Sequence, residues 1–399
     1  MQHDHLLKSQ LPIRVLVVDD SAFMRKAISN MLCESSDFVI AGTAINGEDA
    51  LRKVAAMDID VMTLDIDMPG MDGLAVLEQV MAHHPLPVVI VSSLTEGGAA
   101  VTIRALELGA VDFIFKHLGG SSLKISEIRV PLQEKVRAAA TARSKIQSGS
   151  RQPVVPRALR KATPPFPFSS KNANTGNPDS DGGMQVNLPG DPGVLIIGCS
   201  TGGPQALQVV LTLLPSTFPY PIVVAQHMPK FFTKPFAERL DQLCALEVAE
   251  AQEGDHLKPG RVLIAPGGQH LTLERRGHVV MTHVSDHPKH LPYRPSVDLL
   301  MESAAKLYGQ KVVGLVMTGM GQDGLEGARA IKRAGGSVLA QDEASSIVYG
   351  MPKAVADHGI VDKVVSLQKI STEIQLWVKH QSRHDSADTV LVGLTTSHS

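Results

Sequence analysis

The sequence predicts an α/β protein built from two units, each with a largely parallel sheet. Residues 12–118 and 193–380 both alternate short β-branched runs with helical spacing, as parallel sheets with connecting helices do. The chain from about 144 to 192 is rich in Pro, Ser and Asn and poor in apolar residues, which predicts a flexible linker. We therefore expect domains at 12–135 and 193–380, a linker at 144–192, and a disordered tail at 381–399.

Composition narrows the functional classes. A chain of 399 residues with 43% apolar and 20% charged residues fits a globular protein of two or three domains. The formal net charge of −2 and the lack of a basic stripe argue against nucleic-acid binding. Three scattered cysteines give no disulfide framework or zinc spacing. With no signal pattern and no apolar run of about 20 residues, we expect a cytoplasmic protein that does not insert into membranes.

The first unit is expected to contain five strands joined by helices. The β-branched runs that predict them are Arg14–Val18, Phe38–Thr43, Val61–Leu64, Pro87–Val91 and Val111–Phe115. Helical spacing separates them at Glu48–Met57 and Ala99–Leu108, and Ile125–Lys145 is expected to form a helix leaving the unit.

Polar side chains stand at the ends of these strands. Asp19 and Asp20 close the first strand, Asp65 the third, Ser92 the fourth and Lys116 the fifth. The carboxyl ends of parallel strands meet in one crevice, so three carboxylates and one ammonium are expected to converge there. Clustered carboxylates favour a hard cation such as Mg²⁺, which would also neutralise a transferring phosphoryl group. An aspartate can accept such a group covalently.

On these five positions, residues 13–118 closely resemble the receiver domain of two-component response regulators. The resemblance implies a flavodoxin-like doubly wound sheet with strand order 2-1-3-4-5 and phosphorylation of Asp65 by a histidine kinase. It implies Mg²⁺ held by Asp19, Asp20, Asp65 and the backbone carbonyl of Asp67. The implied switch residues are Ser92, Phe113 and Lys116.

One position departs from the receiver pattern. His117 follows Lys116, where that family usually has a proline, often in a cis bond that orients the lysine. A non-proline cis bond costs about 3 kcal/mol, so we expect a trans bond, a less well placed lysine and weaker phosphorylation.

The second unit is expected to repeat the strand–helix alternation. Its predicted strands are Val194–Ile197, Pro221–Ala225, Arg261–Ala265, Val312–Met317 and Ser337–Gln341. A hairpin of His270–Glu274 and His278–His283, joined by Arg275-Arg276-Gly277, predicts a mixed sheet in this unit.

The segment Gly198–Pro204 places Ser200 at a sharp turn between a strand and a helix. Glycines on both sides allow close backbone approach, which is how a fold exposes a nucleophilic hydroxyl and aims N–H groups at the same point. His227 and Asp323 also follow predicted strands, so one sheet edge supplies hydroxyl, imidazole and carboxylate, as a Ser-His-Asp relay requires. We expect an oxyanion site from backbone N–H groups near His227 and Met320.

The order of these residues along the chain excludes one superfamily. α/β-Hydrolases place the triad as serine, acid, histidine, whereas here the order is Ser200, His227, Asp323. Dinucleotide binding is disfavoured because the turn lacks the G-x-G-x-x-G spacing and no P-loop lysine follows. Cys199 is an alternative nucleophile, but a small buried hydrophobic residue is the better interpretation of its position.

Other residues near the predicted site have weaker assignments. His283, His287 and His290 have loose metal-ligand spacing without an accompanying ligand pattern, so we interpret them as loop histidines. The spacing of Arg294 and Asp298 does not decide between lining the site and pairing structurally.

Residues 193–377 resemble the catalytic domain of bacterial chemotaxis protein-glutamate methylesterases, and the receiver–linker–esterase order matches as well. The matching stretches are Ile197–Pro204, Gln226–Met228, Ala265–His270, Arg294–Asp298 and Thr318–Gly324. The resemblance implies catalysis by Ser200, His227 and Asp323, with Thr201 supporting the site and Met320 in the oxyanion region.

The expected function is that of a phosphorylation-activated esterase. It would hydrolyse glutamate γ-methyl esters on methyl-accepting chemotaxis receptors and deamidate receptor glutamines. We expect a chemotaxis histidine kinase as phosphoryl donor, Mg²⁺ in the receiver, no cofactor in the catalytic domain, and a monomer. The alternative is a response regulator whose second domain only binds a partner, but a binding module has no need of all three relay residues.

Overall fold

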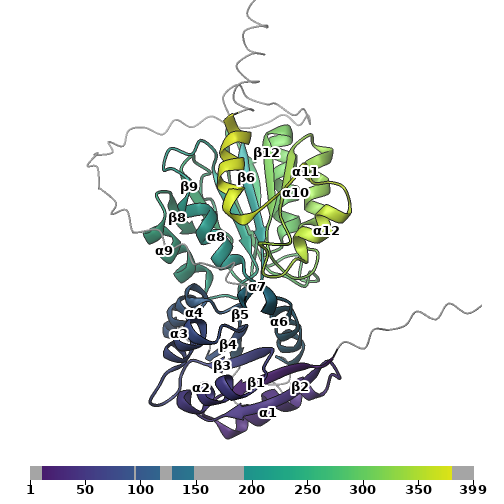
Figure 1. Cartoon of the computed structure of the whole chain (residues 1–399). Coiled ribbons are helices and arrows are strands. Elements are labelled where there is room, and N and C mark those ends of the chain that lie inside the picture. The colour runs from purple at the N-terminus through teal and green to yellow at the C-terminus, as the bar shows by residue number, and fades with distance from the viewer. Residues whose placement is uncertain (1–10, 94–95, 117–127, 148–192, 380–399) are drawn as a thin grey trace, which may run out of the picture.

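The structure, a computed structural model, describes residues 11–93, 96–116, 128–147 and 193–379. The predicted linker from 148 onward, the tail at 381–399 and His117 lie outside the described residues. Figure 1 shows two α/β units stacked end to end. None of the described helices is long and apolar enough to cross a membrane.

The first unit is a five-stranded parallel sheet with the strand order β2-β1-β3-β4-β5, which confirms the predicted topology. Its strands are β1 (Ile13–Val18), β2 (Phe38–Ala44), β3 (Val61–Asp65), β4 (Val88–Ser93) and β5 (Asp112–Lys116). Its connecting helices are α1 (Ala22–Cys33), α2 (Gly47–Ala56), α3 (Gly73–His83) and α4 (Glu96–Leu108).

The helix expected at Ile125–Lys145 is divided in two. Its described part forms α6 (Arg129–Thr141) and α7 (Arg143–Gln147), which are separated by a turn at Ala142. The α6 helix buries Leu132, Val136 and Ala139 and packs against α1 and β5, so it belongs to the first unit.

The second unit has a seven-stranded sheet with the order β14-β13-β12-β6-β7-β9-β8, and every pairing in it is parallel. The strands are β6 (Val194–Cys199), β7 (Ile222–Gln226), β8 (Glu247–Glu250), β9 (Arg261–Ile264), β12 (Val312–Val316), β13 (Ser337–Gln341) and β14 (Lys363–Val365). The helices are α8 (Gly203–Thr212), α9 (Thr233–Leu243), α10 (Val297–Tyr308), α11 (Leu325–Arg333) and α12 (Met351–Asp357), with a 3-10 turn (Gly309–Lys311) and a further helix at 367–379.

The predicted antiparallel hairpin is confirmed, but it does not join the main sheet, so the prediction of a mixed sheet is wrong. Strands β10 (His270–Arg276) and β11 (Val279–Ser285) pair antiparallel with each other and form a separate two-stranded sheet. The hairpin buries one apolar face, including Leu271 and Leu273, in the same core cluster as α10. The hairpin therefore packs against α10 through this apolar face, and the Leu273 N–H donates to Ser303 Oγ on α10 (2.9 Å).

The two units meet along α4, β5, α6 and α7 of the first and along α8, α9 and the strand-end loops of the second (Figure 1). Phe232 is fully buried there and contacts the rings of Phe113 (5.2 Å between centroids) and Phe115 (4.4 Å). The apolar core is therefore continuous across the junction, since residues of both units belong to one buried cluster.

Candidate active site and phosphorylation site

Ser200 lies between β6 and α8, in the turn that the sequence predicted. The Ser200 N–H donates to the carbonyl of Thr318 (3.0 Å), and the Gly203 N–H donates to the carbonyl of Ser200 (2.7 Å). Gly202 has φ +76°, a left-handed conformation that favours glycine. A Cβ on Gly319 would lie 2.7 Å from Ser200 Cβ, so the neighbouring loop also needs glycine at this point.

His227 is placed beside Ser200 by the register of the sheet. Cys199 pairs with Gln226, and the His227 N–H donates to the Cys199 carbonyl (3.0 Å), so the next residues along these strands are neighbours. The ring of His227 is held by Asp323, because its Nε2 donates to Asp323 Oδ2 at 2.8 Å. His227 Nδ1 is buried without a hydrogen-bond partner, so the structure brings Ser200 and His227 together without joining them by a hydrogen bond.

The carboxylate of Asp323 is held by the N-terminus of α10. Its Oδ1 accepts from Ser296 Oγ (3.1 Å) and the Asp298 N–H (3.0 Å), and its Oδ2 accepts from the Val297 N–H (2.8 Å). Burial opposes ionisation, but the hydrogen bond and charge of His227 together with these N–H groups hold the Asp323 pKa below its usual value. The acid is therefore ionised and fixed, as orienting an imidazole requires.

Asp298, whose role the spacing left open, supports the loop that carries Asp323. Its Oδ1 accepts from the N–H groups of Gly324 (2.8 Å) and Gly327 (2.7 Å). Burial and the nearby charge of Asp323 raise the pKa of Asp298 to about 6, against the effect of those two N–H groups. The side chain of Arg294 is exposed, and its carbonyl accepts from the Gly268 N–H (3.1 Å).

Gln226 is a site residue that sequence reasoning missed. Its buried side chain donates through Nε2 to the carbonyls of Ser200 (3.0 Å) and His227 (3.1 Å), and its Oε1 lies 3.0 Å from Cys199 Sγ. A polar residue ending a fully apolar strand was the available signal. Cys199 itself is fully buried, and burial raises the pKa of its thiol, which argues against it as the nucleophile.

Thr201 and Met320 both face the first unit. Thr201 Oγ1 donates to Asp112 Oδ2 (2.5 Å), and Asp112 also pairs with Lys135 Nζ (2.7 Å). Met320 packs against a buried cluster that contains Leu132 of α6. The backbone N–H of His227 already donates to the Cys199 carbonyl, so it is not available to bind an oxyanion. Among the described residues the Met320 N–H has no hydrogen-bond partner.

The acidic crevice of the first unit has the predicted composition. Carboxylate oxygens of Asp19, Asp20 and Asp65 lie within 4.8 Å of one another, and Lys116 Nζ lies 2.8 Å from Asp19 Oδ2 and 2.5 Å from Asp65 Oδ2. Burial raises the pKa of Asp65 to about 6. The negative charge of Asp19 adds to this increase, whereas the hydrogen bond and positive charge of Lys116 oppose it. The Asp67 N–H donates to Asp65 Oδ1 (3.2 Å).

Of the residues implied as a switch, Lys116 lies in this crevice. Ser92 is buried, and its Oγ accepts from Thr102 Oγ1 (3.1 Å). Phe113 is buried and stacks on Phe232 of the second unit. Lys116 and Phe113 belong to the same strand, β5, which therefore connects the crevice with the junction between the units.

The crevice residues fit a divalent cation. Asp19 Oδ2 is buried and accepts no hydrogen bond of good geometry, although it makes the ion pair with Lys116. Three converging carboxylates, of which that of Asp20 is exposed, are a donor set that suits Mg²⁺.

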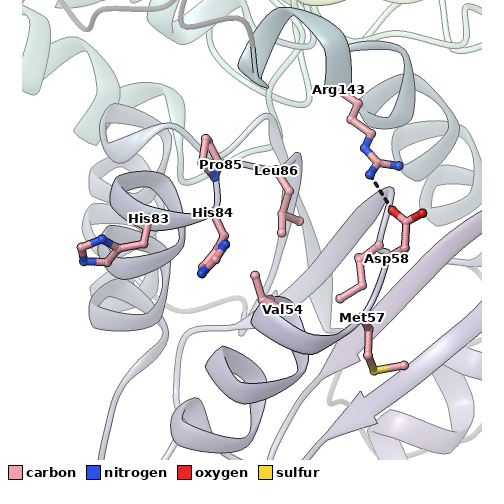
Figure 2. Close-up of a pocket in the computed structure, with 9 residues that line it drawn as sticks. Val54, Met57, Asp58, His83, His84, Pro85, Leu86 and Arg143 are labelled. Carbon is pink, nitrogen blue, oxygen red and sulfur yellow. Dashed lines mark hydrogen bonds and ion pairs between the residues drawn. The ribbon is translucent and has the colours of Figure 1, made fainter.

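Of the histidines interpreted as loop residues, His283 lies instead on β11. Its ring lies near Glu253 and Glu274, and Arg276 already forms ion pairs with both carboxylates. A separate cavity of about 370 Å³ lies at the amino ends of β3 and β4, opposite the acidic crevice. Figure 2 shows its lining, with Arg143 paired to Asp58, and none of the predicted site residues is among them.

The first unit has an acidic crevice, and the second has a serine turn with a histidine–aspartate pair. Together these two sites define the class of protein as a response regulator whose output unit is a hydrolytic enzyme. Residues 15–126 match the response regulator receiver domain family, and residues 195–374 match the CheB methylesterase family.

Relatives of known name extend over nearly the whole chain. The protein-glutamate methylesterase/protein-glutamine glutaminase 1 of Oleidesulfovibrio alaskensis is 47% identical over 367 residues, covering 91% of this chain and 98% of its own. That of Lawsonia intracellularis is 44% identical and covers 90% and 98%. The Thermotoga maritima CheB methylesterase catalytic domain is 42% identical, covers 47% of this chain and 99% of its own, and has a TM-score of 0.46. The chain belongs to the CheB family of response-regulator methylesterase/glutaminases.

Proposed function

We propose that this chain is a phosphorylation-activated enzyme that removes glutamate γ-methyl esters from methyl-accepting chemotaxis receptors and deamidates receptor glutamines. The names of its relatives support the reactions, since they are protein-glutamate methylesterases and protein-glutamine glutaminases. The observation that carries the proposal is the 2.8 Å bond from His227 to the buried Asp323, next to Ser200 at a strand-to-helix turn. The enzyme works as a cytoplasmic monomer, and a chemotaxis histidine kinase supplies the phosphoryl group.

Three side chains and one backbone N–H carry out the first half of this reaction. His227 Nδ1 takes the proton of Ser200 as the serine oxygen attacks the γ-carbonyl carbon, and the carbonyl oxygen becomes negatively charged. The free N–H of Met320 is the donor we assign to that oxyanion. The imidazolium then protonates the leaving methoxy group, and methanol departs from the acyl-enzyme. Asp323 holds Nε2–H throughout and stabilises the imidazolium.

The second half of the reaction releases glutamate. Water loses a proton to His227 Nδ1 and attacks the acyl carbon, and Ser200 leaves after regaining that proton. A glutamine side chain follows the same route with ammonia in place of methanol. The support for this relay is the ionised, fully hydrogen-bonded Asp323 beside the imidazole.

The arrangement of the two units supports inhibition before phosphorylation. Thr201, next to Ser200, donates to Asp112 of the first unit, and Met320 packs against the buried cluster to which apolar side chains of α6 belong. Arg239 pairs with Glu107 (2.5 Å), and Gln205 Nε2 donates to the carbonyls of Leu106 (2.5 Å) and Ala110 (2.8 Å). A long receptor helix needs access to the same edge, so the first unit would obstruct it.

Strand β5 is the proposed connection between the two sites. Its last residue, Lys116, pairs with Asp65, while its first residue, Asp112, holds Thr201. Asp19, Asp20 and Asp65 would hold Mg²⁺, with the Asp67 carbonyl as a further ligand, and the ion would neutralise charge on the transferring phosphoryl group. Once Asp65 carries the phosphoryl group, Lys116 is drawn to it, and the shift of β5 weakens the Asp112–Thr201 contact.

The proposal is tested by methanol release from methylated receptor membranes. Ser200→Ala should abolish release, and acetyl phosphate with Mg²⁺ should raise release by the wild type but not by Asp65→Ala. Full release by Ser200→Ala would sink the nucleophile assignment, and equal stimulation of Asp65→Ala would sink the switch assignment. Loss of hydrolysis in every variant and in the wild type would favour a binding-only output domain.

A further inference from the structure

The ring of Tyr293 covers one face of the His227 imidazole. The two ring centroids are 4.3 Å apart and the ring planes differ by 7°, so the rings are stacked. Tyr293 lies in the segment before α10, far along the chain from β7, and neither its residue type nor its spacing drew attention to it. A half-buried aromatic ring therefore lies directly against the proposed base.

Apart from this stack, the described contacts hold the imidazole at one point only. Its Nε2 is bound to Asp323, whereas its Nδ1 has no hydrogen-bond partner. The Cβ–Cγ bond and this hydrogen bond fix the ring at two points, and rotation about the axis through them still changes the direction in which Nδ1 points. A flat aromatic face restricts this rotation, because a tilted imidazole would either lose contact with the tyrosine ring or clash with it.

We propose that Tyr293 is a positioning residue for His227. Its ring holds the imidazole plane so that Nδ1 faces the Ser200 hydroxyl, and its π-face stabilises the imidazolium that forms when His227 takes the serine proton. The inference rests on the proposed roles of Ser200 and His227, and it adds a residue that those roles do not include.

One short segment then holds both the acid and the base. Ser296, Val297 and Asp298 donate three hydrogen bonds to the carboxylate of Asp323. Tyr293, three residues earlier, stacks on the imidazole that the same carboxylate binds. The relative placement of acid and base is therefore fixed by residues 293–298.

The ring of Tyr293, and not its hydroxyl, carries the proposed role. The hydroxyl lies over Gly321, where an added Cβ would come within 3.3 Å of Oη, and no described residue is its hydrogen-bond partner. Burial, together with the negative charges of Glu134 and Asp323, raises the pKa of Tyr293, so the side chain is a neutral phenol at neutral pH. Phenylalanine should therefore replace it without loss.

The contribution should appear in kcat. The imidazolium exists in the transition states of both steps but not in the resting enzyme, and only an interaction stronger in the transition state raises kcat. A partly desolvated cation–π contact of this kind corresponds to about a tenfold change in rate. Substrate binding does not involve the stacked face, so KM should change little.

The experiment compares Tyr293→Phe with Tyr293→Leu in the full chain, activated with acetyl phosphate and Mg²⁺. We expect Phe to keep kcat for methanol release within about twofold, and Leu, which keeps apolar bulk without a ring, to lower kcat about tenfold at similar KM. Trp377→Leu is the matched control: it also removes a half-buried aromatic ring, but at the amino end of β13, opposite the site, where Trp377 Nε1 donates to Ser337 Oγ (3.0 Å), and it should stay within about twofold.

A second measurement does not depend on the Leu variant. Proton NMR of histidine-labelled protein should show the His227 ring protons shifted upfield by the Tyr293 ring, equally in the wild type and in Tyr293→Phe. Full kcat in a folded Tyr293→Leu, equal losses in Phe and Leu, an equal loss in Trp377→Leu, or no upfield shift would each overturn the inference. Activity in His227→Ala would instead overturn the proposed function, so the two failures are distinguishable.

Discussion

The ion pair between Arg239 and Glu107 gives a quantitative test of inhibition by the first unit. Arg239 lies on α9 of the second unit and makes two contacts with Glu107 on α4, from Nε to Oε1 (2.5 Å) and from the guanidinium to Oε2 (3.2 Å). The arginine side chain is 38% exposed and the glutamate 11% exposed. The pair exists only while the units are docked, so Arg239→Ala should destabilise the docked state alone.

The size of the effect follows from the exposure and the geometry. A two-point pair that is partly exposed contributes about 1 kcal/mol, near the upper end of the range for exposed pairs. If undocking precedes substrate access, removal of about 1 kcal/mol raises the undocked fraction, and with it the basal rate, about fivefold. Under the proposed mechanism, phosphorylated protein is already undocked, so its rate should not change.

The assay is methanol release from receptor membranes with and without acetyl phosphate. Lys332→Ala is a matched control, because Lys332 pairs with Asp362 (2.6 Å) at similar exposure but within the second unit. In a double-mutant cycle, Glu107→Gln and Arg239→Ala together should raise the basal rate no more than one of them alone. An unchanged basal rate in folded Arg239→Ala, or the same rise in Lys332→Ala, would refute docking as the inhibitory contact.

Three further predictions concern single residues. Because the pKa of Asp65 is raised to about 6 and its ionised form must bind the cation, Mg²⁺ affinity should fall about tenfold per pH unit below 6, and calorimetry should show no such slope in Asp65→Asn. Asp323→Asn should lower kcat by a factor on the order of 10³ to 10⁴, because the amide favours the wrong imidazole tautomer; a loss below tenfold would contradict the relay. Gly319→Ala forces a Cβ to 2.7 Å from Ser200 Cβ, so it should lower both kcat and Tm, the latter by a few degrees for about 1–3 kcal/mol of overpacking; unchanged melting and activity would show that the loop yields freely.

The chemistry at the strand ends could be predicted because parallel strands bring their carboxyl ends to one edge. Asp19 follows β1 and Asp65 ends the neighbouring strand β3, and their oxygens do converge. The pairing of Cys199 with Gln226 likewise brings Ser200 and His227 together from separate segments. In both units an apolar run followed by a polar residue was a sufficient signal.

Contacts between the units could not be predicted in this way. The Thr201–Asp112 hydrogen bond joins residues 89 positions apart in different sheets, and no spacing rule relates them. The contact of Phe232 with Phe113 is of the same kind, since each phenylalanine alone is consistent with the core of its own domain. Such contacts depend on how two folded surfaces fit, which periodicity does not encode.

Short or exposed elements were also missed. Strands β8 and β14 stand at the two edges of the seven-stranded sheet and have one buried residue each, so neither contains a buried apolar run. The hairpin strands differ from the prediction at both ends of the turn. Arg275 and Arg276 belong to β10, Gly277 (φ +61°) and His278 form the turn, and β11 runs from Val279 to Ser285. Tyr293 is one aromatic residue in a polar stretch, and only its stacking on His227 distinguishes it.

The most direct test of a phosphorylation-gated serine esterase is the rate at which a serine-directed fluorophosphonate labels the full chain, with the labelled residue identified by mass spectrometry. The account predicts labelling at Ser200, acceleration by acetyl phosphate with Mg²⁺, and no acceleration in Asp65→Ala. Labelling at another residue, or a rate at Ser200 that is the same with and without the phosphoryl donor, would contradict it.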